Sequence, residues 1–205
     1  MIRPIKLPES CSFSDYFKLN AYPEEILANF GYGFELTELT LPQAESLPFA
    51  IEPLQLRLKK TMHLIRADNE MARREFLIAP LLTEVVLATN SQLRVSYPVE
   101  VSSQLRGSID YFLQSRDRLL VIEAKDENLE RGFKQLAVEL IAIAQENQES
   151  LVLKPQIWGA VSSGKIWQFS LLDFEKKIIY QDLNLYSIFT ELEHLLKGLI
   201  GILNA

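Results

Sequence analysis

Residues 107–125 read GSIDYFLQSRDRLLVIEAK, and they decide the predicted fold. Both arms of this stretch alternate apolar residues with others, in the period of two that is typical of β-strands. The alternating residues are Ile109, Tyr111 and Leu113 on the first arm and Leu120, Ile122 and Ala124 on the second. The polar residues 114–117 between the arms predict a tight turn. The stretch therefore predicts a β-hairpin.

The register of this hairpin brings three charged side chains to one place. With a turn centred on residues 116–117, Asp110 lies opposite Glu123. Directly opposed residues share a face of the sheet, with Cβ atoms roughly 4.5–5.5 Å apart. Lys125 joins them because it follows Glu123 by two positions. A bulge or a slip of one residue would separate the three groups, and the sequence leaves that alternative open.

Two carboxylates held this close in a partly dry site repel each other, so one must take a proton or a cation must lie between them. Mg²⁺ suits oxygen ligands of this kind. Lys125 beside the ion would orient or deprotonate a water, or neutralise charge on a phosphate. The alternative is an edge hairpin with a Glu–Lys pair and a solvated aspartate. The short spacing by itself favours that alternative.

The wider pattern resembles the PD-(D/E)xK nuclease superfamily. Asp110 is followed thirteen positions later by Glu123-Ala124-Lys125, on two consecutive predicted strands that a helix follows. The runs 70–80, 123–128 and 159–167 are similar to uncharacterised PD-(D/E)xK-like proteins common in cyanobacteria, and the likeness covers roughly residues 66–200. The proline of the superfamily's name is absent, as in many members.

The resemblance implies a role for each matching residue. Asp110 and Glu123 would bind Mg²⁺ or Mn²⁺ together with the backbone carbonyl of Ala124, and Lys125 would position or activate the water. Glu70 matches an accessory acidic residue that would hold a second metal or a metal-bound water, and Gln135 matches a glutamine that would fix the attacking water or a phosphate. From the residues alone, the favoured role of Glu70 is an i,i+4 pair with Arg74, for about 0.3–0.5 kcal/mol, and Gln135 is a solvated amide.

The fold that the resemblance implies is a single restriction-endonuclease-like α/β domain over 1–205, with a mixed sheet flanked by helices. Residues 66–200 would form its core and residues 1–50 an N-terminal extension of unknown role. The implied function is metal-dependent phosphodiester hydrolysis of nucleic acid, with DNA the expected substrate. A homodimer is the assembly by which many such nucleases cut two strands.

Composition favours a globular domain, because 48% of the residues are hydrophobic and only 23% are charged. The net charge of −6 argues mildly against a broad nucleic-acid surface, since Lys and Arg drive phosphate binding. It favours a rival reading, in which the fold survives as a binding or assembly module without catalysis. One cysteine, no apparent signal peptide and no long apolar run predict a cytoplasmic protein with no membrane partner.

The remaining elements follow from periodicity and punctuation. Residues 54–66 permit either a strand or a helix, and Pro80 should kink or split a helix over 68–88. Pro98 marks the strand at 93–101 as an edge or a bulge. The other expected strands are 34–41, 155–162, 165–172 and 177–183, and the other expected helices are 23–30, 126–148 and 185–202.

Overall fold

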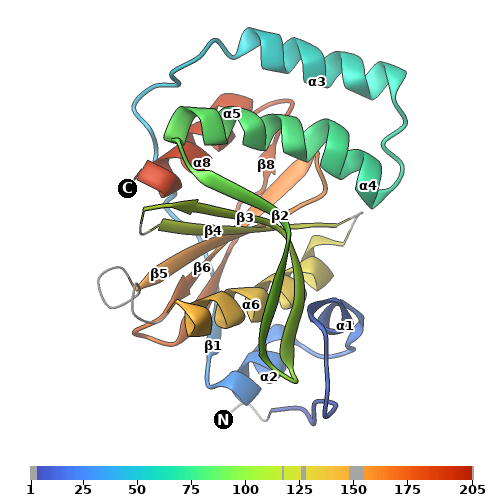
Figure 1. Ribbon diagram of the computed structural model, residues 1–205, viewed down its shortest axis with the longest axis vertical. Helices are drawn as coiled ribbons and strands as arrows, with labels where there is room; N and C mark the ends of the chain where they lie inside the picture. Colours follow the sequence, from blue (N-terminus) through green and yellow to red (C-terminus); the bar gives the residue numbers. More distant parts are fainter. Residues whose placement is uncertain (1–3, 117, 126–127, 148–154, 205) are drawn as a thin grey trace.

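The computed structural model describes residues 4–116, 118–125, 128–147 and 155–204, and these form an α/β fold with one mixed sheet (Figure 1). Its strands run in the order β1-β7-β6-β5-β4-β3-β2, with β8 paired to β6. The strands are β1 (Gly33–Thr37), β2 (Gln92–Ser102), β3 (Leu105–Ser115), β4 (Arg118–Ala124), β5 (Gln156–Ser162), β6 (Ile166–Asp173), β7 (Ile178–Asp182) and β8 (Tyr186–Ser187). The pairs β1–β7 and β4–β5 are parallel and the others antiparallel, so the predicted mixed sheet is confirmed.

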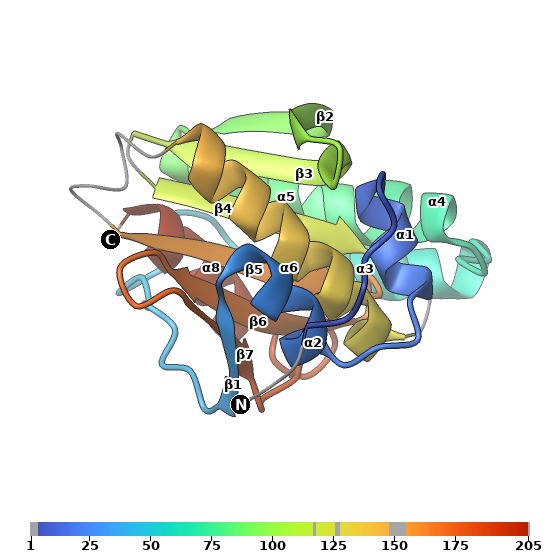
Figure 2. The ribbon, with the colours of Figure 1, turned by 90° about the horizontal axis from the view of Figure 1, so that it is seen from below.

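Helices cover both faces of this sheet, as predicted (Figures 1 and 2). The helices are α1 (Phe13–Lys18), α2 (Pro23–Leu27), the 3₁₀ helix η1 (Ala28–Phe30), α3 (Glu52–Leu64), α4 (Glu70–Arg73), the π-helix η2 (Arg74–Ile78), α5 (Ala79–Thr89), α6 (Leu129–Glu146) and α8 (Leu192–Asn204). One buried cluster joins the sheet to α1, α2 and α6, and a second joins it to α3, η2, α5 and α8. No helix in the described ranges is long and apolar enough to cross a membrane.

Strand β4 lies between these two clusters, which explains its unbroken apolar run. Val121 belongs to the cluster beside α6, whereas Leu120 and Ile122 belong to the cluster beside α8. Strands that are covered on both faces read as continuous hydrophobic sequence because both sets of alternating side chains are buried. Glu123 lies at the end of this run and is 1% exposed, so its carboxylate has little access to solvent.

The predicted hairpin and its register are confirmed. Strands β3 and β4 pair from Ser115↔Arg118 to Tyr111↔Ile122, as a turn at 116–117 requires. Arg116 has a φ of 49°, a left-handed conformation that suits a turn, and residue 117 lies outside the described residues. Strand β2 is the edge strand that Pro98 predicted, and its register shifts between Glu100 and Ser102.

Residues 54–66, for which the sequence left two readings open, lie largely within helix α3. The predicted helix over 185–202 was wrong at its beginning, because α8 begins only at Leu192. Tyr186 pairs with β6 as part of β8, its ring meets Phe169 with 5.4 Å between centroids, and its hydroxyl donates to Asp182 Oδ2 at 3.1 Å. These contacts hold the segment extended despite its helical apolar spacing.

The helix predicted over 68–88 is divided just before Pro80, into α4, η2 and α5. Proline has no N–H to donate to the preceding turn, which weakens regular α-helical bonding there. The π-helical turn η2 starts at Arg74 and faces strand β3 through Tyr111, whose hydroxyl donates to the Arg74 carbonyl at 3.1 Å. The hydrogen bond fixes the position of η2 relative to the hairpin.

Candidate active site

The candidate site lies where β3 and β4 separate. Their pairing ends at Tyr111↔Ile122, although β4 continues to Ala124 and remains bonded to β5. At this point the N–H of Ala124 donates to Asp110 Oδ2 at 2.9 Å. The Asp110 carboxylate therefore accepts a hydrogen bond that a backbone carbonyl of β3 would accept if the pairing continued. It faces the end of β4.

Three ion pairs hold the acidic groups of the site. The Lys125 ammonium contacts the Glu123 carboxylate and lies 4.0 Å from Glu70 Oε2, at the start of α4. Arg74 Nη1 lies 2.6 Å from Asp110 Oδ1. Glu70 is the most exposed of these acids, with 40% of its side chain accessible, against 14% for Asp110 and 1% for Glu123. Solvent exposure therefore decreases from Glu70 through Asp110 to Glu123, which is the most deeply buried of the three.

The structure therefore brings together four of the residues singled out in the sequence: Glu70, Asp110, Glu123 and Lys125. Gln135 is neither solvated nor at the open side of the site. It is buried on α6, and its Nε2 donates to Glu139 Oε1 at 2.9 Å. Gln135 is linked to the site through its hydrogen bond to Glu139, which lies on the α6 side of Glu123.

Glu139 is a residue that the sequence reasoning missed. It is fully buried on α6, and three oxygens in this region have no hydrogen-bond partner among the described residues: Glu123 Oε2, Glu139 Oε2 and Gln135 Oε1. Two buried carboxylates that face each other can be satisfied by one shared proton. The sequence feature that could have identified Glu139 is its position four residues after Gln135, within a predicted helix that is largely apolar.

Burial raises the pKa of both glutamates. For Glu123 the desolvation, increased by the charge of Asp110, raises the pKa to about 8. For Glu139 the desolvation and the charge of Glu123 raise the pKa well above its ordinary value. Both shifts favour the protonated form of the pair. Lys125 contacts Glu123 and stabilises its charge, so Glu139 is the residue of the pair that is favoured to carry a proton.

Lys125 is the cation that this arrangement needs. Burial acts to lower its pKa, but the carboxylates of Glu123 and Glu70 outweigh that effect and raise it. The side chain is 12% exposed, so it is held in place while its ammonium remains close to the surface. As an ammonium it donates hydrogen bonds to the acids, and it would donate equally to a phosphate or a water.

The donor set fits a hard divalent ion in its chemistry. Asp110 and Glu123 offer carboxylate oxygens to such an ion. In an extended strand the N–H and C=O of one residue point to the same side. Because the N–H of Ala124 points to Asp110, its carbonyl points into the same gap between β3 and β4.

As the side chains stand, no three His, Cys, Asp or Glu side chains of the described residues are grouped so that they could hold an ion. Both deep carboxylates instead have a cation against them, Arg74 on Asp110 and Lys125 on Glu123. An ion that used these ligands would therefore have to compete with a cationic side chain of the protein.

Gly132 allows α6 to pass close to Lys125, which leads to a stability prediction. A Cβ at Gly132 would lie 2.7 Å from Val161 Cγ1 and 2.9 Å from Lys125 Cγ. An alanine in a helix interior normally adds up to ~1 kcal/mol of stability over glycine. Here we expect Gly132→Ala to reduce the free energy of unfolding by about 1–3 kcal/mol, because Lys125 and Val161 must move. Urea unfolding measures the change.

Gly198→Ala on α8 is the matched control, since its Cβ would lie 3.2 Å from Gln43 Nε2, the end of a flexible side chain, and 3.2 Å from Leu41 Cδ1. Its effect should be smaller than that of Gly132→Ala. If Gly132→Ala were as stable as the unchanged protein, the close approach of α6 to Lys125 would not be a packing constraint.

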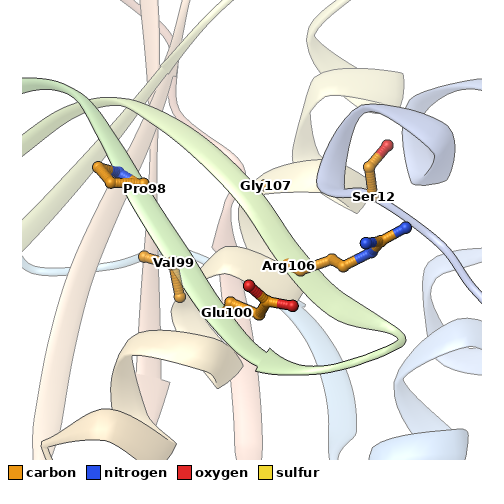
Figure 3. Close-up of a pocket in the computed structure, with 6 residues that line it drawn as sticks. All are labelled: Ser12, Pro98, Val99, Glu100, Arg106 and Gly107. Atoms are coloured by element: carbon orange, nitrogen blue, oxygen red, sulfur yellow. The ribbon is translucent and has the colours of Figure 1, made fainter.

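A hollow of about 390 Å³ lies between α1 and the β2–β3 ribbon, with Ser12 and Arg106 at its rim (Figure 3). Arg106 pairs across the ribbon with Glu100 and donates from Nη2 to Ser10 Oγ at 2.9 Å. This hollow therefore lies where the N-terminal segment meets the β2–β3 ribbon.

The chain was also compared with known proteins. No protein-family model matches it. No curated protein matches it either.

Proposed function

We propose that this protein is a divalent-metal-dependent nuclease of the PD-(D/E)xK superfamily and that its substrate is DNA. The observation that supports the proposal is the convergence of Asp110, Glu123 and Lys125 at the point where β3 leaves β4. The hydrogen bond from Ala124 N–H to Asp110 ties the aspartate to the strand end that carries the other two groups. The resemblance in sequence supports the same assignment.

In this proposal each group has a distinct task. Asp110, Glu123 and the Ala124 carbonyl would hold Mg²⁺ or Mn²⁺. The bound ion supplies Lewis-acid chemistry that polarises a phosphodiester and activates a water. Lys125 donates hydrogen bonds that orient the water or stabilise charge on the phosphate.

Two further residues support these groups from opposite sides. Glu70 lies on the exposed side of Lys125, and in this proposal it would hold a second ion or a metal-bound water. Gln135 acts as a positioning residue rather than a ligand, because it bonds to Glu139 behind Glu123.

A second candidate function is a nuclease-like domain that binds a partner without catalysis. The observation in its favour is that Arg74 and Lys125 already neutralise Asp110 and Glu123. The net charge of −6 also leaves little cationic surface for nucleic acid. Under this alternative, divalent ions have no site at the carboxylates.

A metal titration separates the two candidates. We expect 10 mM Mg²⁺ or Mn²⁺ to raise the melting temperature of the wild type by about 3–5 °C, as a dissociation constant of about 1 mM requires. Asp110→Ala should show no such rise. Differential scanning fluorimetry with and without EDTA measures both proteins. Equal shifts in both proteins, or none in either, would contradict an ion at Asp110.

A further inference from the structure

We propose that Arg74 is a phosphate-binding residue that occupies Asp110 until a divalent ion displaces it. This inference rests on the nuclease function proposed above, and it assigns to Arg74 a role that the sequence pattern did not indicate. The sequence suggested only an i,i+4 pair with Glu70 for this arginine. The ion pair with Asp110, at 2.6 Å between Nη1 and Oδ1, is the observation that carries the inference.

Arg74 is held on three sides beside the site. Its guanidinium carbon lies 5.2 Å from the centroid of the Tyr111 ring, and Nη2 lies 3.5 Å from Ser96 Oγ on β2. The Tyr111 hydroxyl anchors the arginine's own carbonyl at 3.1 Å. The Tyr111 ring and Ser96 contact the guanidinium beside Asp110, and the bond from the Tyr111 hydroxyl holds the Arg74 backbone. The side chain is 22% exposed, so a ligand in the site can reach it.

Charge makes Arg74 and a divalent ion competitors. Both would lie against the Asp110 carboxylate, and like charges at such short range repel in a poorly solvated site. An ion bound to Asp110 therefore weakens the Arg74 ion pair. The guanidinium needs another anion within reach, and a phosphate oxygen beside the ion has suitable geometry, because arginine binds phosphate through paired N–H groups.

Lys125 is less suited to this exchange. Its ammonium is shared between Glu123 and Glu70, so losing one carboxylate to an ion still leaves it the other. Arg74 lies against Asp110, and the charge of the more exposed Glu70 also acts on it. Arg74 also begins the π-helical turn η2, and turns of this kind frequently lie at functional sites. The two cations therefore have different roles around the same ion.

The test measures binding rather than turnover. Wild type, Arg74→Gln and Arg57→Gln are titrated with Mg²⁺ by isothermal calorimetry, and then with a fluorescein-labelled DNA duplex in Ca²⁺, under conditions that give no cleavage. Arg57 is a matched control because it also pairs with a carboxylate, Glu84, at 3.3 Å on the surface. We expect Arg74→Gln to bind Mg²⁺ about tenfold more tightly and the duplex about tenfold more weakly. Arg57→Gln should change neither.

Replacing an arginine with a purely structural role would not raise the affinity for Mg²⁺ and lower the affinity for the duplex at the same time. Unchanged or weaker Mg²⁺ binding by Arg74→Gln would overturn the competition, and unchanged duplex affinity would overturn the phosphate contact. If neither the wild type nor Arg74→Gln bound Mg²⁺, the failure would lie with the proposed nuclease function itself. Mg²⁺ binding by Arg74→Gln alone would show that the ion does not displace Arg74 in the wild type, and it would overturn the exchange.

Discussion

Asp110→Asn is expected to lower metal-dependent DNA cleavage by about 10³-fold while the protein remains folded. The amide has no charge, so it cannot hold a divalent ion as the carboxylate would. Its oxygen can still accept from the Ala124 N–H, so the end of β4 should keep its place. Cleavage of duplex, nicked, branched and single-stranded DNA in Mn²⁺ is the measurement, and circular dichroism checks the fold.

Asp68→Asn is the matched control, because Asp68 is exposed and lies just before α4. It should cut as the wild type does. If Asp110→Asn from the same purification scheme cut as fast as the wild type, the activity would come from a contaminant or from another part of the protein. If neither the wild type nor either variant cleaved any of these substrates, the non-catalytic alternative would be favoured.

Glu139→Gln is expected to raise the free energy of unfolding by about 1–3 kcal/mol at pH 8 and to leave it nearly unchanged at pH 4.5. The amide donates to Glu123 Oε2 at every pH, whereas the wild type needs a proton for that contact. The pKa of each glutamate is raised by burial in the folded state, so the folded protein binds more protons than the unfolded chain. Wild-type stability from this pair is therefore fully present below pH 4.5, the ordinary glutamate value, and is lost as pH rises towards about 8.

Urea unfolding at pH 4.5, 6, 7 and 8 measures this effect. Glu130→Gln is the control on the same helix, because Glu130 is exposed at the start of α6. Its effect should stay within about 1 kcal/mol. A Glu139→Gln protein that was less stable than the wild type at pH 8 would show that Glu139 is needed as a charged group, and the proton would then not lie between the two glutamates.

The sequence was sufficient to predict the hairpin and its register, because both depend on local rules. Alternating apolar residues defined the arms, and the polar turn set which residues face each other. The placement of Lys125 beside Glu123 then followed from the period of two, and their ion pair agrees with it. The α/β class, with a mixed sheet and helices on both faces, was what the resemblance implied, and the structure agrees with it.

The partners of the site could not be predicted in the same way, because they depend on how distant segments are packed. Arg74 reaches Asp110 only because η2 lies against β3, and no spacing along the chain encodes that contact. Glu139 meets Glu123 because α6 is buried on all sides between the sheet and the N-terminal helices. The beginning of α8 was wrong for a related reason, since the tertiary contacts of Tyr186 outweigh local helical spacing.

The hairpin of β3 and β4 has a consequence for the order in which the chain folds. A hairpin closes a short loop, so Asp110 and Glu123 can meet early, whereas Glu70 and Arg74 join them only after α4 and η2 dock from a more distant part of the chain. Two acids therefore come together before their basic partner Arg74 arrives. During synthesis or refolding, an ion from the solvent that bridged these acids would hold the nascent hairpin in register.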